Sequence, residues 1–453
     1  MSTKEFMFNE EKPSKLLLKF CIPAIIGMLI NALFNFVDAI FIGQLGTEQM
    51  AAASITFPFT MFFIGVGMIF GVGGSSYISR LLGQKNNRRA EKSVSVSVFF
   101  SVIISVLLTI FFLLTLTPLL KLFGATGKTL EYAREYMIPY LIGSIFVVLN
   151  VTLGNIIRAQ GAPFFTMIAM SIGGGLNILL DPLLIFNVGM GIGGAAVATI
   201  LSRIFTWLLF VWYYKSGKST VSLSLRQMKP DVEMFKEILK IGIPSFMFQL
   251  LTTISTGIIN VLASAYGTDA VAGMGIVIRI LNIGMFIIFG FSKGFQPIAG
   301  YNYGAGNSLR LKRLSLLSMI YATIICLVTT FINYLFSEPL ITMFTKSTAV
   351  ITIAKEALFA GSSVLPTFGV QIILATLFLA CGKGKEGGFL SMARQGIFFI
   401  PAAFIFSSLF GLKGIYWIQP FSDLLTFISS LILGMMFFKK LSIKSEADFS
   451  YAE

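Results

Sequence analysis

The stretch 22-IPAIIGMLINALFNFVDAIFIGQLGT-47 is the most informative part of the chain. It is apolar over more than the roughly 20 residues that cross a bilayer, and it carries one carboxylate, Asp38. The stretch 243-IPSFMFQLLTTISTGIINVLASAYGT-268 repeats its pattern 221 residues later. At this shift, residues 22–87 align with residues 243–308 without a gap, and 11 of the 66 positions are identical. The repeat predicts a membrane protein built from two related halves.

Composition extends this interpretation to the whole chain of 453 residues. Hydrophobic residues make up 56% and charged residues 12%, about half the charged share of a soluble domain. The chain has no histidine, which excludes haem ligation, HExxH metalloproteases and histidine general-base chemistry. Cys21, Cys326 and Cys381 are isolated in or near apolar segments, so we interpret them as small core residues, not as a metal or disulfide site.

Apolar runs between charged or Gly/Pro/Asn breaks predict an all-α membrane protein with twelve transmembrane helices. The first run follows a polar segment without a small-residue cleavage site, so we interpret it as a retained span and not a signal peptide. The predicted spans are 18–42, 52–80, 93–117, 134–157, 163–187, 194–214, 238–265, 271–300, 314–336, 352–379, 388–410 and 414–438.

Lysine and arginine positions predict the orientation of these spans. The N-terminus, the C-terminus and one set of alternate loops hold 24 of the 34 basic residues, whereas the other loops hold six. Cytoplasmic loops carry this excess, so both termini are predicted to be cytoplasmic. The net charge of +14 is therefore mainly a topology signal with some attraction to anionic lipids, and nucleic-acid binding is not expected.

Six spans separate the two copies of the repeat. Because six is even, both copies point the same way, which predicts two parallel six-helix lobes with a cleft between them that rock against each other, as in transporters. The predicted domains are an N-terminal lobe with the cation site (1–217), a cytoplasmic linker (218–237) and a C-terminal lobe (238–453).

Charged side chains within spans are functional candidates, because placing a carboxylate at the bilayer centre costs about 2.5–3.5 kcal/mol. Only Asp38, Asp181 and Asp423 among the acidic residues fall clearly within the predicted spans. Asp38 and Asp181 are predicted at similar depth in the outer half of the N-terminal lobe, together with Asn177 and Thr199. These oxygen ligands suit Na⁺, or a proton shared between the two carboxylates.

Alternatives remain open for this cluster. The aspartates also have a structural interpretation as ion-pair partners of Arg203, which lies one turn from Thr199. Pro182 frees the carbonyl of Ile178, which could ligate a cation or allow bending, but Pro23 and Pro182 could equally be structural kinks.

The C-terminal lobe offers fewer candidates. Arg279 and Asp423 are predicted at equal depth, which suggests an ion pair or, as the weaker alternative, a substrate contact by Asp423. Lys293 and Arg394 are predicted nearer the inner surface as snorkelling anchors.

Several motifs together resemble the MATE (multidrug and toxic compound extrusion) family. They are 36-FVDAIFIG-43, the Asn177-x-x-x-Asp181-Pro182 run and the twelve-helix repeat. The motifs 290-GFSKGFQP-297 and 394-RQGIFFIP-401 look like those of its bacterial MepA-like branch. The resemblance covers about residues 12–440.

The resemblance implies a V-shaped two-lobe exporter coupled to inward H⁺ or Na⁺ flow. It implies that Asp38, Asn177, Asp181 and Thr199 form the coupling site and that Pro23 lies at a bend of the first helix. One departure is that family members with a C-lobe coupling site carry an acidic residue in the seventh helix. Span 238–265 has none, which puts coupling through the C-terminal lobe in doubt.

These observations predict a secondary active antiporter in the bacterial cytoplasmic membrane that exports lipophilic or cationic drugs. Gly382-Lys383-Gly384-Lys385 lacks the spacing and the Ser/Thr of a P-loop, so an ion gradient is the expected energy source. We expect a monomer among membrane lipids, without a cofactor other than the coupling ion. The alternative is a flippase of a lipid-linked cell-envelope precursor; an enzyme is not expected.

Overall fold

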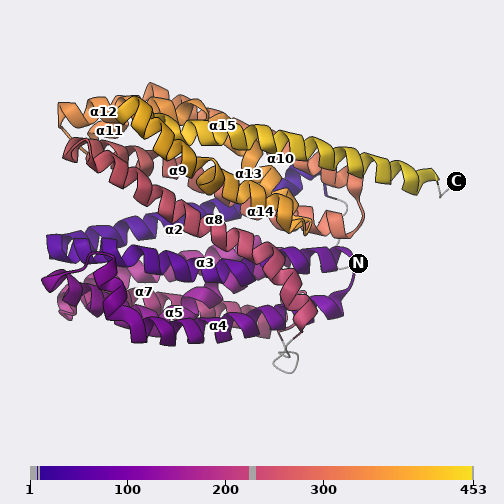
Figure 1. The fold of residues 1–453 in the computed structure, drawn as a ribbon. Helices are drawn as coiled ribbons and strands as arrows, with labels where there is room; N and C mark the ends of the chain where they lie inside the picture. Colours follow the sequence, from indigo (N-terminus) through magenta and orange to yellow (C-terminus); the bar gives the residue numbers. More distant parts are fainter. Residues whose placement is uncertain (1–7, 9–10, 224–230, 451–453) are drawn as a thin grey trace. The chain divides into compact units, whose positions relative to one another are not determined.

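The computed structural model describes residue 8, residues 11–223 and residues 231–450, the last nine of these by their backbone alone. Contacts divide the chain into two compact units, which we treat separately. The N-unit is Ile26–Phe246, and the C-unit is Met1–Ile25 together with Met247–Glu453. Each is built from helices that run alongside one another (Figure 1).

Two helices contribute to both units: α2 (Pro13–Leu45) and α8 (Val232–Ser264). The N-unit further contains α3 (Thr47–Gly83), α4 (Asn87–Leu122), α5 (Gly127–Ala159), α6 (Pro163–Pro182), the π-helical turn Leu183–Asn187 and α7 (Gly191–Lys215). The C-unit further contains α9 (Thr268–Gly304), α10 (Ser308–Leu335), α11 (Ser337–Thr342), α12 (Thr348–Ser363), α13 (Leu365–Ala380), α14 (Gly384–Met392), the π-helical turn Ala393–Ile397 and α15 (Phe399–Ser450).

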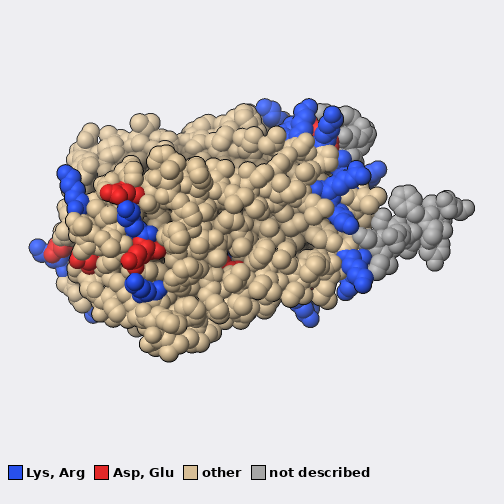
Figure 2. Space-filling model, turned by 90° about the horizontal axis from the view of Figure 1, so that it is seen from above, with Lys and Arg blue, Asp and Glu red and all other residues tan. Residues whose placement is uncertain are grey.

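The described residues contain ten helical segments that are long and apolar enough to cross a membrane. The pair α12 and α13, bent by 47°, forms one more span. The segment Gly384–Leu441 divides into two at Gly411, whose φ of 61° interrupts the helix, and this gives twelve spans. On the face seen in Figure 2, side chains between the two ends of the helices are almost all uncharged. The predicted all-helical fold with twelve spans is confirmed.

Residues that are identical in the two copies of the repeat lie where corresponding helices end and where the next helices begin. Helix α3 ends at Gly83 and helix α9 at Gly304. The side chain of Asn86 accepts a hydrogen bond from the backbone N–H of Arg89 (3.1 Å), and that of Asn307 does the same for Arg310 (3.2 Å). Such capping satisfies backbone donors at the first turn, which explains how the Gly/Asn break starts α4 and α10 at equivalent positions.

Helix α5 is the most buried span of the N-unit and packs against α3, α4 and α7. Glycines on α3 permit this approach. A Cβ atom at Gly71 would lie 2.9 Å from the carbonyl oxygen of Val151 on α5. Small residues of this kind let helix backbones approach within a membrane, where no hydrophobic force drives helices together.

The first parts of α2 and α8 pack on helices of different units. A Cβ atom at Gly73 of α3 would lie 2.2 Å from the Ile238 carbonyl oxygen of α8, within the N-unit. A Cβ atom at Gly294 of α9 would lie 2.6 Å from Cα of Cys21 on α2, within the C-unit. The predicted domains 1–217 and 238–453 assign each helix wholly to one lobe, whereas the contacts divide α2 after Ile25 and α8 after Phe246. These close approaches are the reason for the difference.

The start of α8 is held to the N-unit by charge as well. Asp231 lies beside the first turn of α8, where its carboxylate accepts a hydrogen bond from the backbone N–H of Met234 (3.0 Å). Its other oxygen is 2.5 Å from Nζ of Lys92 on α4, and this hydrogen bond lowers the pKa of Asp231. The predicted linker 218–237 therefore ends inside a helix. Its residues 224–230 lie outside the described part of the chain.

Candidate cation and substrate site

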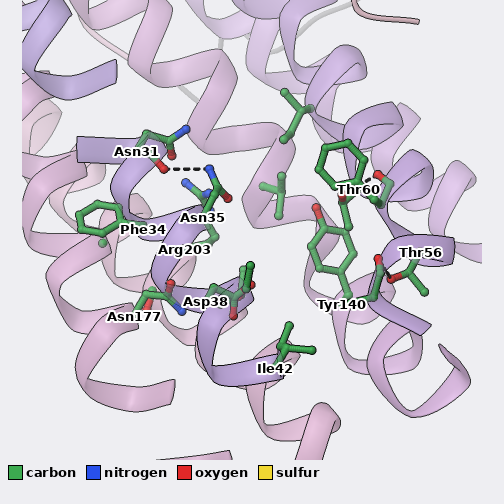
Figure 3. Close-up of a pocket in the computed structure, with 18 of the residues that line it drawn as sticks. Asn31, Phe34, Asn35, Asp38, Ile42, Thr56, Thr60, Tyr140, Asn177 and Arg203 are labelled. Carbon is green, nitrogen blue, oxygen red and sulfur yellow. Dashed lines mark hydrogen bonds between the residues drawn. The ribbon is translucent and has the colours of Figure 1, made fainter. Parts of the chain in front are cut away.

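The N-unit contains a cavity of about 370 Å³ between α2, α3, α5, α6 and α7 (Figure 3). Three of the four predicted cation ligands line it: Asp38 from α2, Asn177 from α6 and Thr199 from α7. The fourth predicted ligand, Asp181, is hydrogen-bonded to Asn177 on the same helix, so three helices, α2, α6 and α7, contribute to one site.

Asp181 lies one helical turn after Asn177 and is fully buried. Its Oδ1 accepts a hydrogen bond from Nδ2 of Asn177 at 3.1 Å, whereas its Oδ2 has no partner among the described residues. Asp38 also has a buried oxygen, Oδ1, without a partner in the described part of the chain. The two carboxylates are within electrostatic range of each other. A buried carboxylate oxygen without a donor is costly, so each of these atoms is suited to receive a proton or a cation.

The two predicted helix-bend prolines differ in their local structure. Pro182 is the last residue of α6, and the π-helical turn Leu183–Asn187 follows it directly. Such turns arise where the regular helical hydrogen bonds are interrupted, which a proline does by removing its N–H. Pro23 lies inside the continuous helix α2, two residues before the contacts of α2 change from the C-unit to the N-unit.

Two tyrosines at the cavity were not found from the sequence. Tyr136 and Tyr140 of α5 line the cavity, and their rings stack at 6.2 Å between centroids. Their spacing of four residues in an otherwise apolar span was an available signal, since residues four apart share a helix face. Asn31 and Asn35 of α2 line the same cavity, and Nδ2 of Asn35 donates to the Asn31 carbonyl at 2.8 Å (Figure 3).

Arg203 also lines the cavity, from the same face of α7 as Thr199. Among the described residues, no carboxylate lies within 4.0 Å of its guanidinium, so the alternative in which Arg203 pairs with the aspartates is not formed. Its backbone carbonyl accepts a hydrogen bond from Nδ2 of Asn150 at 2.7 Å. The guanidinium is thus left facing a cavity that also holds a carboxylate.

The predicted pair of Arg279 with Asp423 in the C-unit is wrong. Asp423 is buried and pairs with Arg394, whose Nε and Nη2 lie 2.9 and 3.3 Å from its two carboxylate oxygens. Nε2 of Gln419 donates to the same carboxylate at 2.6 Å. Arg279 is exposed on α9.

Arg394 is also not a snorkelling anchor, because only 3% of it is exposed. It lies in the π-helical turn Ala393–Ile397, and its guanidinium is 4.1 Å from the ring centre of Phe368. Ser422 donates a hydrogen bond to the Arg394 carbonyl at 2.7 Å, and Ser255 donates to the Gln395 carbonyl at 2.5 Å. Depth counting assumed regular helices, whereas the irregular turn alters how Arg394 projects. Lys293 is half-buried on α9.

The donor set fits a hard monovalent cation better than a transition metal. No group of three His, Cys, Asp or Glu residues that could hold a metal ion occurs in the described part of the chain. The N-unit cluster instead combines two carboxylates, one amide and one hydroxyl, which are oxygen donors suited to Na⁺ or to proton binding.

Comparison with known proteins gives this geometry a family context. The MatE family model matches residues 23–183 and again residues 244–405. The chain belongs to the MATE family. The second match begins 221 residues after the first, which is the spacing of the predicted repeat.

Relatives in the MATE family align over nearly the whole chain. The multidrug export protein MepA of Staphylococcus aureus (strain MRSA252) is 30% identical over 448 residues, 98% of each chain. MepA of Staphylococcus haemolyticus (strain JCSC1435) is 30% identical over 413 residues, 91% of each chain.

Solved structures of MATE transporters share the fold. A MATE structure in complex with MaL6 has a TM-score of 0.92 at 30% identity and covers 98% of this chain and 100% of that chain. An outward-facing multidrug resistance MATE transporter also has a TM-score of 0.92, at 29% identity, covering 97% and 99% of the two chains. The predicted membership in the MATE family is confirmed, and the chain is a multi-pass membrane transporter.

Proposed function

We propose that this protein is a secondary active multidrug efflux antiporter that exports lipophilic and cationic compounds in exchange for H⁺ or Na⁺. The observation that carries the proposal is the pair of buried carboxylate oxygens, Oδ1 of Asp38 and Oδ2 of Asp181, which have no hydrogen-bond partner among the described residues. They lie at or beside a cavity in a membrane-embedded unit. Carboxylates in such a position mark ion pathways in transporters.

The coupling follows from electrostatics at this cluster. An ionised Asp38 attracts a cationic compound into the cavity, whereas a bound proton or Na⁺ neutralises it and favours release. Because the carboxylate belongs to the wall of the cavity, one site can alternate between the coupling ion and the exported compound. Asn177 and Thr199 supply the further oxygens that Na⁺ needs.

Relatives support the transported class. MepA of S. aureus carries the name multidrug export protein. The apolar part of the cavity lining includes Met50, Met170 and Phe57, which suit lipophilic compounds through dispersion and sulfur contacts. We further propose a location in a bacterial cytoplasmic membrane, cytoplasmic termini and a monomer as the working unit.

The flippase alternative is less well supported. A carrier of a lipid-linked diphosphate needs several cations against its charges. Arg203 is the only basic residue among those that line the N-unit cavity, and Asp38 offsets it.

The test uses purified protein in liposomes with a pH gradient and a Na⁺ gradient applied separately. We expect export of a lipophilic cationic dye to follow at least one gradient. Asp38→Asn and Asp181→Asn, which keep the side-chain shape but remove the ionisable group, should reduce gradient-driven export to the level of empty liposomes.

Asp269→Asn is the matched control, since Asp269 is exposed in the first turn of α9, and it should export at the unmodified rate. Dye export that ignores both gradients contradicts the antiport mechanism. Undiminished export in both cluster variants contradicts the site.

A further inference from the structure

Arg203 is the one cavity residue whose charge the proposed function leaves unused. In the described part of the chain, its guanidinium neither pairs with a carboxylate nor forms a hydrogen bond with a side chain, and it lines the cavity of about 370 Å³. Among the described residues, the structure therefore holds a cation in a membrane-embedded cavity that is not paired directly with a carboxylate. Ionised groups in such places are costly and rarely lack a purpose.

Arg203 lines the same cavity as Asp38, Tyr136 and Tyr140. Tyr136 is within electrostatic range of Asp38, Asp181 and Arg203. Arg203 itself is in range of Tyr136 and Tyr140. The site thus presents an acidic group, Asp38, a basic group, Arg203, and tyrosine side chains to one volume (Figure 3).

Neighbouring polar groups on α7 do not occupy the guanidinium. The hydroxyl of Ser202 donates to the Ala198 carbonyl at 2.8 Å, and that of Thr206 donates to the Ser202 carbonyl at 2.9 Å. Both hydrogen bonds stay within the helix, so the five N–H donors of the guanidinium remain open to an acceptor that enters the cavity.

The chemistry of the guanidinium selects that acceptor. Its planar array of donors matches a carboxylate in a two-point geometry, and such charge-assisted pairs are stronger than neutral hydrogen bonds. The apolar lining, which includes Phe34, Met61 and Ile64, leaves room for an aromatic body. A cavity of this volume lies within the range of small-molecule sites.

We propose that Arg203 binds the acidic group of zwitterionic aromatic compounds, whose cationic group faces Asp38, so that the transporter prefers zwitterions over simple cations. This rests on the proposed export of small molecules and specifies which of them bind best. A fixed positive charge in the cavity attracts the acidic group and repels a second cation, which gives the preference its sign.

The experiment compares two dyes with one aromatic core: rhodamine B, which carries a free carboxyl group, and its ethyl ester, which is a cation. Equilibrium binding to purified protein in detergent is measured by fluorescence anisotropy without any ion gradient. Arg203→Gln should weaken rhodamine B binding about tenfold, equivalent to about 1.4 kcal/mol, and leave ester binding equal or tighter. Arg203→Lys keeps the positive charge but loses the planar two-point donor geometry of the guanidinium, so it should retain part of the preference.

Arg279→Gln is the matched control, because Arg279 is an exposed arginine within a span of the C-unit, and it should change neither Kd. Thermal unfolding of every variant shows whether it is folded, and Arg203→Met offers a second neutral replacement. A change of less than threefold in the ratio of the two Kd values, or an equal loss for both dyes, overturns the proposal. Binding is measured without ion gradients, so a failure of antiport in liposomes would not affect the binding result. Equally, a failure of the binding preference would not affect the antiport result.

Discussion

At the residue scale, Arg394 and Asp423 form the buried ion pair of the C-unit. Both side chains are only 4% exposed, and Gln419 and Phe368 complete their surroundings. The carboxylate of Asp423 is therefore already matched by a cation that belongs to the protein. Asp38 and Asp181 differ from Asp423, because each has a carboxylate oxygen without a hydrogen-bond partner among the described residues. The pairing of Asp423 also agrees with the lack of an acidic residue in span 238–265.

Breaking this pair should destabilise the protein strongly. Arg394→Met or Asp423→Asn leaves one buried group without its partner, and the expected loss is about 3–5 kcal/mol of unfolding free energy. Thermal unfolding in detergent checks it, with Glu338→Gln as the control. Glu338 pairs with Lys355 at 2.7 Å on the exposed surface, so its loss should be barely detectable. Equal stability of the buried and exposed variants would contradict the role given to the pair.

At the scale of the helices, Gly73 and Gly294 occupy equivalent positions in the two copies of the repeat, and each allows two helices to pack closely. Gly73 of α3 lies against α8, and Gly294 of α9 lies against α2. The sequence shows these glycines as identical positions but does not show what they touch. In the structure, each glycine lies where the backbone of a neighbouring helix approaches closely, α8 at Gly73 and α2 at Gly294.

Gly73→Ala and Gly294→Ala should each lower stability by about 1–3 kcal/mol, since the added methyl group meets backbone atoms that cannot move easily. The apparent Tm in detergent measures the effect. Gly257→Ala is the matched control, because nothing lies within 4 Å of the Cβ it adds, and it should be neutral or slightly stabilising. Unchanged Tm values in both crossing variants would show that the helices are free to separate there.

At the scale of the whole molecule, the repeat governs how the chain is shared between its two units. The contacts of α2 change after Ile25 and those of α8 after Phe246, which are 221 residues apart, and each change comes two residues after a proline, Pro23 or Pro244. Helices α2 and α8, which are equivalent in the repeat, thus each contribute to both units and divide between them at equivalent positions. The chain therefore passes from one unit to the other within α2 and within α8.

Orientation in the membrane is testable by cysteine labelling. The three native cysteines are buried, so they provide a low background. With cytoplasmic termini, Lys128→Cys and Lys346→Cys should react with an impermeant maleimide in intact cells. Lys85→Cys and Lys385→Cys should react only after permeabilisation, because basic loops stay in the cytoplasm. All four positions are exposed. The reverse labelling pattern would invert the proposed topology.

The sequence by itself determined the number of spans, the 221-residue repeat and the aspartates that remain in the membrane. Apolar length and charge position suffice for these, because the bilayer fixes how long a span must be and where charges are tolerated. The sequence also predicted that Asn177 and Asp181 are neighbours, because residues four apart share a helix face.

Only the tertiary structure decided which side chains meet across helices. It paired Asp423 with Arg394 instead of Arg279, left Arg203 facing a cavity, and added Tyr136 and Tyr140 to that cavity. These contacts depend on how each helix is rotated and where its turns become irregular, as in Ala393–Ile397 and at Gly411. Hydropathy and depth carry no information about rotation, so the pairing had to come from packing.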